Sequence, residues 1–257
     1  MFRYQIIALL CTITLGSDCF AQASVKDSSI AAPMINASLG LHLPGRDMAN
    51  RFGSSSAIGG GFMHKTRTSW IFGFETQFLS GNDIREEGIL DPISTTPDAD
   101  GNRYVIDGNG TYAELFMYER GYTMTAKAGY VLPVIGPNPN SGLVVMMGVG
   151  FMQHKIRIEV RDNTAPQLKG DLKKGYDRLS NGLLYSQFVG YLHMGNKSLV
   201  NFFAGLEALE GFTSNRRSVN YDTGLHDDTK RLDVLYGVKV GWIFPLYARV
   251  PEKRYYY

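Results

Sequence analysis

The chain has 257 residues, a formal net charge of +2 and aromatic residues at 12% of its positions. This length is compatible with a single all-β domain. Lys and Arg are spread along the sequence rather than gathered in one stretch. We therefore expect no nucleic-acid partner, because binding to a phosphate backbone requires a basic patch.

The N-terminus has the pattern of a secretory signal peptide. Arg3 precedes an apolar run over residues 6–16, which is too short to cross a bilayer as a helix. Ala21-Gln22-Ala23 supplies the small residues of a cleavage site. We expect Sec export, cleavage near Ala23 with loss of residues 1–23, and a short periplasmic segment over residues 24–32.

Both cysteines, Cys11 and Cys19, lie in this leader. Asp18 directly precedes Cys19, and a charged residue at that position does not suit a lipid-modified cysteine. We expect a mature chain that has no disulfides, no thiolate metal ligands and no cofactor.

Eight later segments alternate between apolar and polar or small residues. A period of two is that of a β-strand, whose side chains point in turn to opposite faces. The predicted strands cover residues 33–43, 57–65, 70–79, 121–134, 143–160, 183–194, 199–212 and 232–246.

The aromatic residues of the third and last strands allow two different folds. Trp70, Phe72 and Phe74 share one face of their strand, and Glu75 lies on the other. Trp242 likewise lies on the apolar face of the last strand. In a soluble sandwich these aromatic residues would be buried between two sheets. In a membrane barrel they would face lipid, and the polar faces would fill the lumen.

The lengths of the connections decide between these folds. Long and short connections alternate along the chain, and the longest cover residues 80–119, 161–181 and 213–230. This segregation is typical of outer-membrane barrels, and closure is required because open sheet edges are not satisfied in lipid. We predict an eight-stranded antiparallel up-and-down transmembrane β-barrel over residues 33–246. Its long loops are extracellular, its short turns are periplasmic, and residues 247–257 form a periplasmic tail.

Two strands depart from the simple pattern. The strand over 183–194 has apolar residues on both faces, so the sequence does not assign its orientation. Residues 154–160 of the fifth strand still alternate but carry charges. We expect this half of the strand to extend beyond the bilayer into water.

The inward faces of the predicted strands carry charged residues of both signs, Glu75, Lys127, Glu207 and Lys239. An eight-stranded barrel is only wide enough for its own side chains. We expect the carboxylates and the lysines to form ion pairs that fill the lumen. A proton or ion path through the same groups is the alternative.

Residues 239–246 resemble the C-terminal β-signal that the outer-membrane insertion machinery recognises. Lys239 matches its polar position, Gly241 its glycine, and Phe244 and Leu246 its apolar positions. The β-signal normally ends the chain, whereas residues 247–257 follow it here.

The leader, the strand pattern and this motif together resemble the small OmpA/OmpX-type outer-membrane barrels over about residues 33–246. The resemblance implies an outer-membrane location and contact with outer-membrane lipid and lipopolysaccharide. It carries no catalytic motif. Residues 136–142 and 175–179 also resemble parts of uncharacterised small barrels from bacteria with elaborate export and assembly machinery, such as type IX secretion.

Some eight-stranded outer-membrane barrels resemble lipid A deacylases or palmitoyl transferases, which use a His, a Ser and an acid. His154, Ser186 and Glu210 are the corresponding candidates here, but no local motif ties them together. We therefore expect a protein that is not an enzyme.

Two loop stretches allow binding alternatives. Residues 98–102 resemble a fragment of a calcium loop, although the remaining ligands are missing, so an ordinary Asp/Gly turn is favoured. Arg216-Arg217 and residues 169–174 could contact lipopolysaccharide phosphates or could simply be solvated.

We interpret the chain as a non-catalytic outer-membrane barrel. The favoured role is an accessory or scaffold subunit of a larger outer-membrane complex, in secretion or barrel-assembly machinery, with other outer-membrane proteins or surface lipoproteins as partners. A stand-alone structural or adhesion barrel and a lipid A-modifying enzyme are the alternatives.

Overall fold

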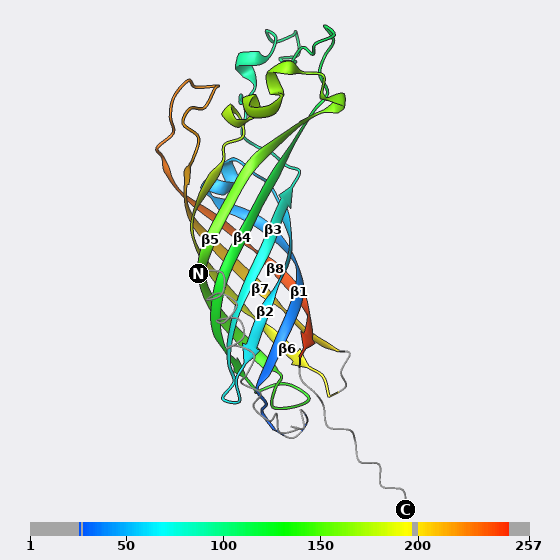
Figure 1. Cartoon of the computed structure of the whole chain (residues 1–257), viewed down its shortest axis with the longest axis vertical. Helices are drawn as coiled ribbons and strands as arrows, with labels where there is room; N and C mark the ends of the chain where they lie inside the picture. Colours follow the sequence, from blue (N-terminus) through cyan, green and yellow to red (C-terminus); the bar gives the residue numbers. More distant parts are fainter. Residues whose placement is uncertain (1–25, 27, 197–199, 247–257) are drawn as a thin grey trace, which may run out of the picture.

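Eight strands form one closed ring in the computed structural model (Figure 1). Each strand pairs antiparallel with its neighbours in the sequence, and β8 pairs with β1 to close the ring. The strands are β1 Ala32–Arg46, β2 Ser55–Lys65, β3 Trp70–Gly81, β4 Leu115–Leu132, β5 Gly142–Val160, β6 Ser180–Met194, β7 Asn201–Asn215 and β8 Lys230–Pro245. The predicted fold class, an eight-stranded antiparallel up-and-down transmembrane β-barrel, is confirmed.

The structure describes residues 26, 28–196 and 200–246. The predicted leader over residues 1–23 and the predicted tail over residues 247–257 lie outside these ranges. No helix among the described residues is long and apolar enough to cross a membrane. The helical segments are short 3₁₀ turns: Asp47–Asn50, Asp91–Ile93, Arg161–Asn163, Pro166–Leu168 and Gly170–Gly175.

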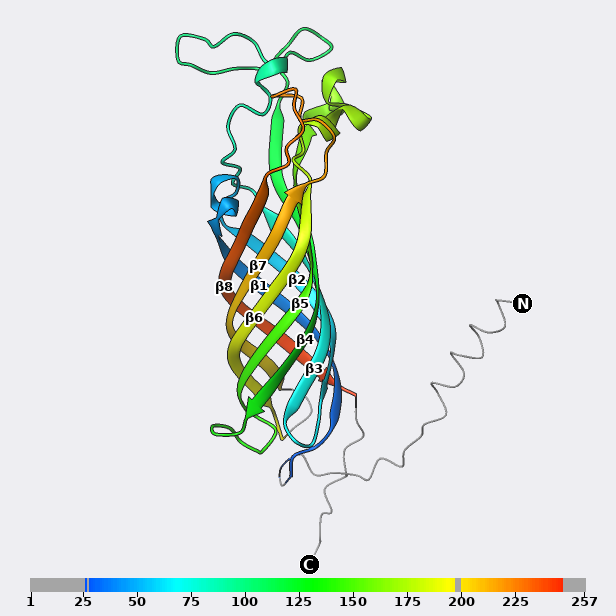
Figure 2. The same ribbon diagram turned by 90° about the vertical axis from the view of Figure 1, so that its left-hand side faces the viewer.

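The long connections gather at one end of the ring. They follow β1, β3, β5 and β7, and Figure 2 shows the tilted strands leading up to them, with the short turns at the opposite end. We call the four long connections, residues 47–54, 82–114, 161–179 and 216–229, the crown. β4 and β5 reach further into the crown than the other strands do (Figure 1).

The start of β4 corrects the sequence analysis. The strand begins at Leu115, not at residue 121, because residues 115–120 pair with residues 155–160 of β5. Glu119 and Arg120 suggested a polar loop, but Glu119 lies in the lumen and Arg120 on the outer surface. The predicted extension of the fifth strand therefore forms half of a long two-stranded hairpin.

The aromatic faces of the strands point outward. Trp70, Phe72, Phe74 and Trp242 are each 47–53% exposed, and Glu75 is 7% exposed. In β6, the strand that the sequence left unassigned, Leu184 and its inward neighbours are buried, whereas the alternate residues are exposed. On these strands the outward face is thus mainly aromatic and aliphatic and Glu75 is enclosed, which is the arrangement of a membrane barrel.

Glycines of the last strands make room for two aromatic rings inside the barrel. The rings of Phe188 and Phe203 meet edge to face, with centroids 5.6 Å apart. A Cβ atom on Gly241 would lie 2.2 Å from Cζ of Phe203. The glycine of the β-signal motif therefore also has a packing role, because no larger residue fits beside this ring.

Replacing Gly241 with Ala should destabilise the barrel by about 1–3 kcal/mol, since the added methyl group overpacks the lumen against Phe203. The smaller side chain in the double variant G241A/F203L should recover part of this loss. Urea unfolding after refolding in detergent, where no insertion machinery is present, measures the effect. V240A, which changes a neighbouring outward side chain, is the control. A refolded G241A barrel as stable as the wild type would contradict the packing role.

Candidate functional site

Four charged side chains meet in the middle of the lumen. Nζ of Lys127 lies 2.5 Å from Oε2 of Glu75 and 2.9 Å from Oε1 of Glu207. Nζ of Lys239 lies 2.5 Å from Oε1 of Glu75 and 2.9 Å from Oε1 of Glu207. Each carboxylate therefore binds both lysines and each lysine binds both carboxylates. We call this arrangement the charge square.

Neutral side chains complete the hydrogen bonding of the charge square. Ser38 donates to Oε1 of Glu75 at 3.1 Å, and the amide of Gln77 donates to both oxygens of Glu207 at 3.2 Å. Nε2 of His42 lies 3.3 Å from the second oxygen of Glu207. Every carboxylate oxygen of the square thus has a partner, and this compensates for the loss of hydration on burial.

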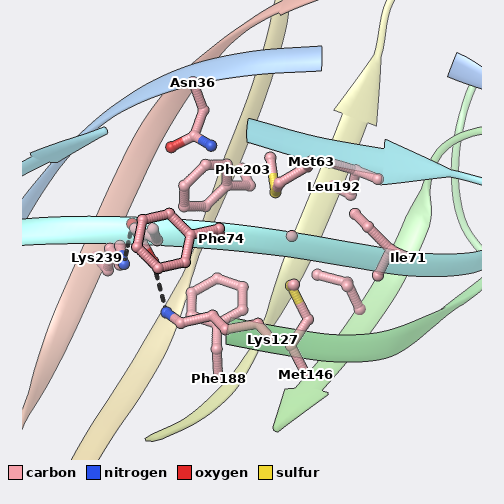
Figure 3. A pocket seen from close by; sticks show the side chains of 13 residues that line it. Asn36, Met63, Ile71, Phe74, Lys127, Met146, Phe188, Leu192, Phe203 and Lys239 are labelled. Carbon is pink, nitrogen blue, oxygen red and sulfur yellow. Dashed lines mark hydrogen bonds and ion pairs between the residues drawn. The ribbon is translucent and has the colours of Figure 1, made fainter. Parts of the chain in front are cut away.

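An apolar layer closes the lumen below the charge square. Met63, Met146, Phe188 and Phe203 belong to this layer (Figure 3). The cavity between the layer and the square has a volume of about 30 Å³, which is room for about one water molecule. The cavity is therefore too small for a solute.

The turn between β4 and β5 covers the underside of this layer. The side chain of Asn140 accepts hydrogen bonds from the backbone N–H of Ile30 at 2.8 Å and from Lys65 at 3.1 Å. The amide of Asn138 donates to the carbonyl of Met194. The compact block of residues 136–142 that the sequence singled out therefore ties three parts of the chain together at the end of the barrel opposite the crown.

A second apolar layer lies above the charge square. From the charge square toward the crown, the next lumen-facing residue on β7 after Glu207 is Leu209. On β8, Leu235 faces the lumen four residues before Lys239. Both leucines are fully buried in a cluster with Met152 of β5. The charge square is therefore enclosed between apolar layers on both sides.

Asp233 organises another polar group above that layer. Its carboxylate binds Arg51 at 2.5 Å and Nε2 of His154 at 2.8 Å, and it accepts a hydrogen bond from Thr213. Glu119 is fully buried nearby, and neither of its oxygens has a hydrogen-bond partner among the described residues. The sequence pattern does not identify these contacts, because Arg51 belongs to a loop and Asp233, His154, Thr213 and Glu119 belong to four different strands.

Arg178 connects three loops of the crown. Its Nε lies 2.8 Å from Glu86 of the β3–β4 loop, and its Nη2 lies 2.5 Å from Asp222 of the β7–β8 loop. Arg178 itself belongs to the β5–β6 loop, and all three side chains are largely buried. A partly buried guanidinium with two carboxylates forms strong, directional bonds.

The residues just before Arg178 reinforce this connection. Arg217 donates two hydrogen bonds to Asp177, at 2.7 and 2.5 Å, and the bond to Asp177 raises the pKa of Arg217. The rings of Tyr176 and Tyr221 meet edge to face at 5.4 Å. Residues 175–179, the second block singled out by the sequence, therefore hold the crown together. Arg217 is thus paired with a carboxylate within the crown.

The three candidate residues of a lipid-modifying enzyme are not brought together. His154 lies in the lumen against Asp233, and Ser186 is buried in the lumen. Glu210 points outward, where it accepts a hydrogen bond from Gln187 at 3.3 Å. A nucleophile, a base and an acid must lie within hydrogen-bond reach of one another, and these three residues do not.

The calcium-like stretch forms a self-contained turn. Oδ1 of Asp98 accepts hydrogen bonds from the backbone N–H groups of Asp100 at 3.0 Å and Asn102 at 2.8 Å. The bond from Asn102, followed by that from Asp100, lowers the pKa of Asp98. Within the part of the chain that the structure describes, no group of three or more His, Cys, Asp and Glu side chains could hold a metal ion.

The β-signal residues divide between the two faces of β8. Lys239 belongs to the charge square and Gly241 packs against Phe203, whereas Phe244 and Leu246 are 53% and 54% exposed on the outer surface. The backbone N–H of Leu246 donates to the carbonyl of Pro33. The motif therefore lies where β8 closes the ring against β1.

No family model matches the sequence, and no curated protein matches it. Several solved structures are similar. Ail, the attachment invasion locus protein of Yersinia pestis, is 8% identical with a TM-score of 0.40, over 84% of this chain and 99% of that chain. The N-terminal β-barrel domain of Pseudomonas aeruginosa OprF is 10% identical with a TM-score of 0.35, over 83% and 97%. Neisserial surface protein A is 12% identical with a TM-score of 0.36, over 82% and 97%.

The chain is a small eight-stranded transmembrane β-barrel. The pairing of its own strands establishes this fold. The similarities to the solved structures are too weak to assign a function to the chain. The predicted resemblance to OmpA/OmpX-type barrels is confirmed at the level of the fold.

The charge square predicts a large difference between two glutamates of β7. E207Q leaves two buried lysines with one carboxylate and should destabilise the barrel by about 3–5 kcal/mol. E210Q changes the outward glutamate of the same strand and should alter stability by about 0.5 kcal/mol or less. Urea unfolding in detergent measures both. Adding K239M to E207Q should restore part of the lost stability, because the charges balance again. Equal stability of E207Q and E210Q would exclude the charge square as a stabilising element.

Proposed function

We propose that this chain is an integral outer-membrane barrel that works as a scaffold or accessory subunit of a larger outer-membrane complex and binds its partner through the crown. The enclosed charge square supports a function at the surface rather than in the lumen. Apolar layers lie on both sides of the square, and the cavity beside it holds about one water molecule. Conduction of a solute or an ion would require the central side chains to move apart.

The observation that carries the proposal is the connection of three crown loops through Arg178. Loops that serve only as connections need no such ties, and long loops are uncommon unless they have a function. Ion pairs and a shared apolar cluster fix the shape of the crown before any partner arrives. A surface fixed in advance loses little conformational entropy on binding and is therefore suited to a protein partner.

The crown is joined to the barrel by continuous packing. Met48 and Phe52 of the first loop and Leu168 of the third are fully buried in the same cluster as Met152 and Leu184 of the barrel wall. The β4–β5 hairpin extends into the same region. A partner held by the crown would therefore be held rigidly relative to the membrane, which is the task of a scaffold in secretion or barrel-assembly machinery.

Replacing Arg178 with Ala should release the three loops from one another and weaken partner binding by about tenfold or more, while the barrel still folds. Affinity purification of the tagged protein from membranes solubilised in mild detergent measures the recovery of partners. R103A is the matched control, because Arg103 forms an exposed ion pair with Asp91 in the crown at 3.7 Å.

Stoichiometric partners with the wild type and R103A, and their loss with R178A, would support the proposal. Recovery of the barrel alone from wild-type membranes would overturn the subunit role and favour a stand-alone structural or adhesion barrel. Partner recovery that is unchanged in R178A would show that the crown is not the binding surface.

A further inference from the structure

Basic residues lie directly above the apolar band on one side of the barrel. Phe78 points outward near the crown end of β3, Tyr122 is its cross-strand partner on β4, and the ring of Phe151 on β5 lies 6.0 Å from that of Tyr122. Toward the crown, the next outward residue on β4 after Tyr122 is Arg120. On β5, Lys155 is the second outward residue after Phe151. The chemistry of the outer surface thus changes within one or two residues from aromatic to cationic.

Arg120 and Lys155 are direct cross-strand neighbours. The register of β4 and β5 pairs these two residues, and both point outward. Like charges directly opposite each other on a sheet destabilise it, and no carboxylate among the described residues lies in ion-pair distance of either one. Glu119, the adjacent residue, is buried in the lumen. The pair therefore lacks a counter-charge within the part of the chain that the structure describes.

The position of Arg120 is fixed by its neighbours. The guanidinium donates to Ser80 at 2.8 Å and to the carbonyl of Glu119 at 2.7 Å, and it lies 4.7 Å from the ring centroid of Tyr118. These contacts use one nitrogen, Nη1, as the donor. The remaining N–H groups stay available for an anion.

A groove runs over this pair toward the crown. Its lining includes Phe78, Arg120, Lys155 and Arg157 of the strands, together with Lys173 of the β5–β6 loop. The acidic residues that border it are already engaged. Glu159 binds Arg157 at 2.6 Å, and Asp177 is bound by Arg217 in the crown. The groove therefore has an excess of positive charge at its centre.

We propose that this groove binds a phosphate group on the headgroup of an outer-leaflet glycolipid, with Arg120 and Lys155 as its ligands and Lys173 closing over it. A ligand there must match a charged groove that continues directly into an apolar wall. A phosphorylated lipid does so, because its phosphate lies at the level of Arg120 while its acyl chains lie along Phe78 and the aromatic band below. The guanidinium and ammonium groups supply charge-assisted hydrogen bonds to phosphate oxygens.

The inference rests on the proposed placement in the outer membrane, and the test separates the two. The refolded barrel is inserted into phosphatidylcholine vesicles that contain either bisphosphorylated lipid A or the same lipid after removal of its phosphates. The affinity for each lipid is measured for the wild type, for R120Q/K155Q, and for R161Q. Arg161 is the matched control, since it lies at the far end of the same hairpin and binds Glu114.

The double variant should bind the bisphosphorylated lipid roughly tenfold to a hundredfold more weakly than the wild type. R161Q should bind it as the wild type does, and the three proteins should not differ toward the dephosphorylated lipid. Without phosphorylated lipid the double variant should unfold at a urea concentration equal to or above that of the wild type, because the like-charge pair is removed.

Equal affinity of the wild type and the double variant for the bisphosphorylated lipid would overturn the assignment of the groove. Equal affinity of the wild type for both lipids would overturn the role of the phosphate. A barrel that fails to insert into any vesicle would contradict the membrane placement instead, and that failure is visible before any lipid affinity is measured.

Discussion

Two carboxylates and two ammonium groups enclosed in an apolar tube are stable only together. Removing any one of Glu75, Lys127, Glu207 and Lys239 leaves a buried charge without compensation, which is costly at low dielectric. This requirement accounts for much of the molecule. It explains why Ser38, Gln77 and His42 point inward around the square. Because the square joins β3, β4, β7 and β8 across the lumen, it also constrains how the ring can close.

The same logic operates a second time at the surface. Arg178 holds Glu86 and Asp222 from two other loops, as the lysines of the square hold carboxylates from different strands. The ion pairs of the charge square connect strands across the lumen, and those of Arg178 connect crown loops that are distant in the sequence. Both devices place a cation between two carboxylates where little water reaches. The result is a barrel whose lumen is filled by side chains and whose crown loops are joined by ion pairs, which supports the proposed role of the surface.

The sequence was sufficient for the architecture because a strand has a period of two. Trp70 and Glu75 lie an odd number of positions apart, so a strand must send them to opposite faces, and the alternation of loop lengths then implied a membrane barrel. Contacts across the lumen were harder to predict from the sequence. That both lysines reach both glutamates depends on register and on the tilt of the strands. The strand over 183–194 was ambiguous because Leu184 and Phe188 fill the lumen while their neighbours are also apolar.

Loops and strand ends were harder to predict for physical reasons. The start of β4 was placed too late because two adjacent charged residues, Glu119 and Arg120, are typical of a loop. In the structure one faces the lumen and the other faces the outside of the barrel, so both fit a strand. The block of residues 175–179 stood out in composition, but its role depends on partners in two other loops. The Arg120–Lys155 pair likewise becomes visible only once the register of β4 and β5 is known.

The orientation of the strands is tested most directly by a spin-label scan along β3 in lipid vesicles. Single cysteines at positions 71–78 are labelled with a nitroxide, and collisions with oxygen and with a water-soluble nickel complex are measured. The account predicts high oxygen and low nickel accessibility at the even positions, which include Phe72, Phe74 and Phe78, and low accessibility to both reagents at the odd positions. Even positions shielded from both reagents, with Glu75 and Gln77 open to nickel, would contradict it, because the aromatic face would then be the core of a soluble protein.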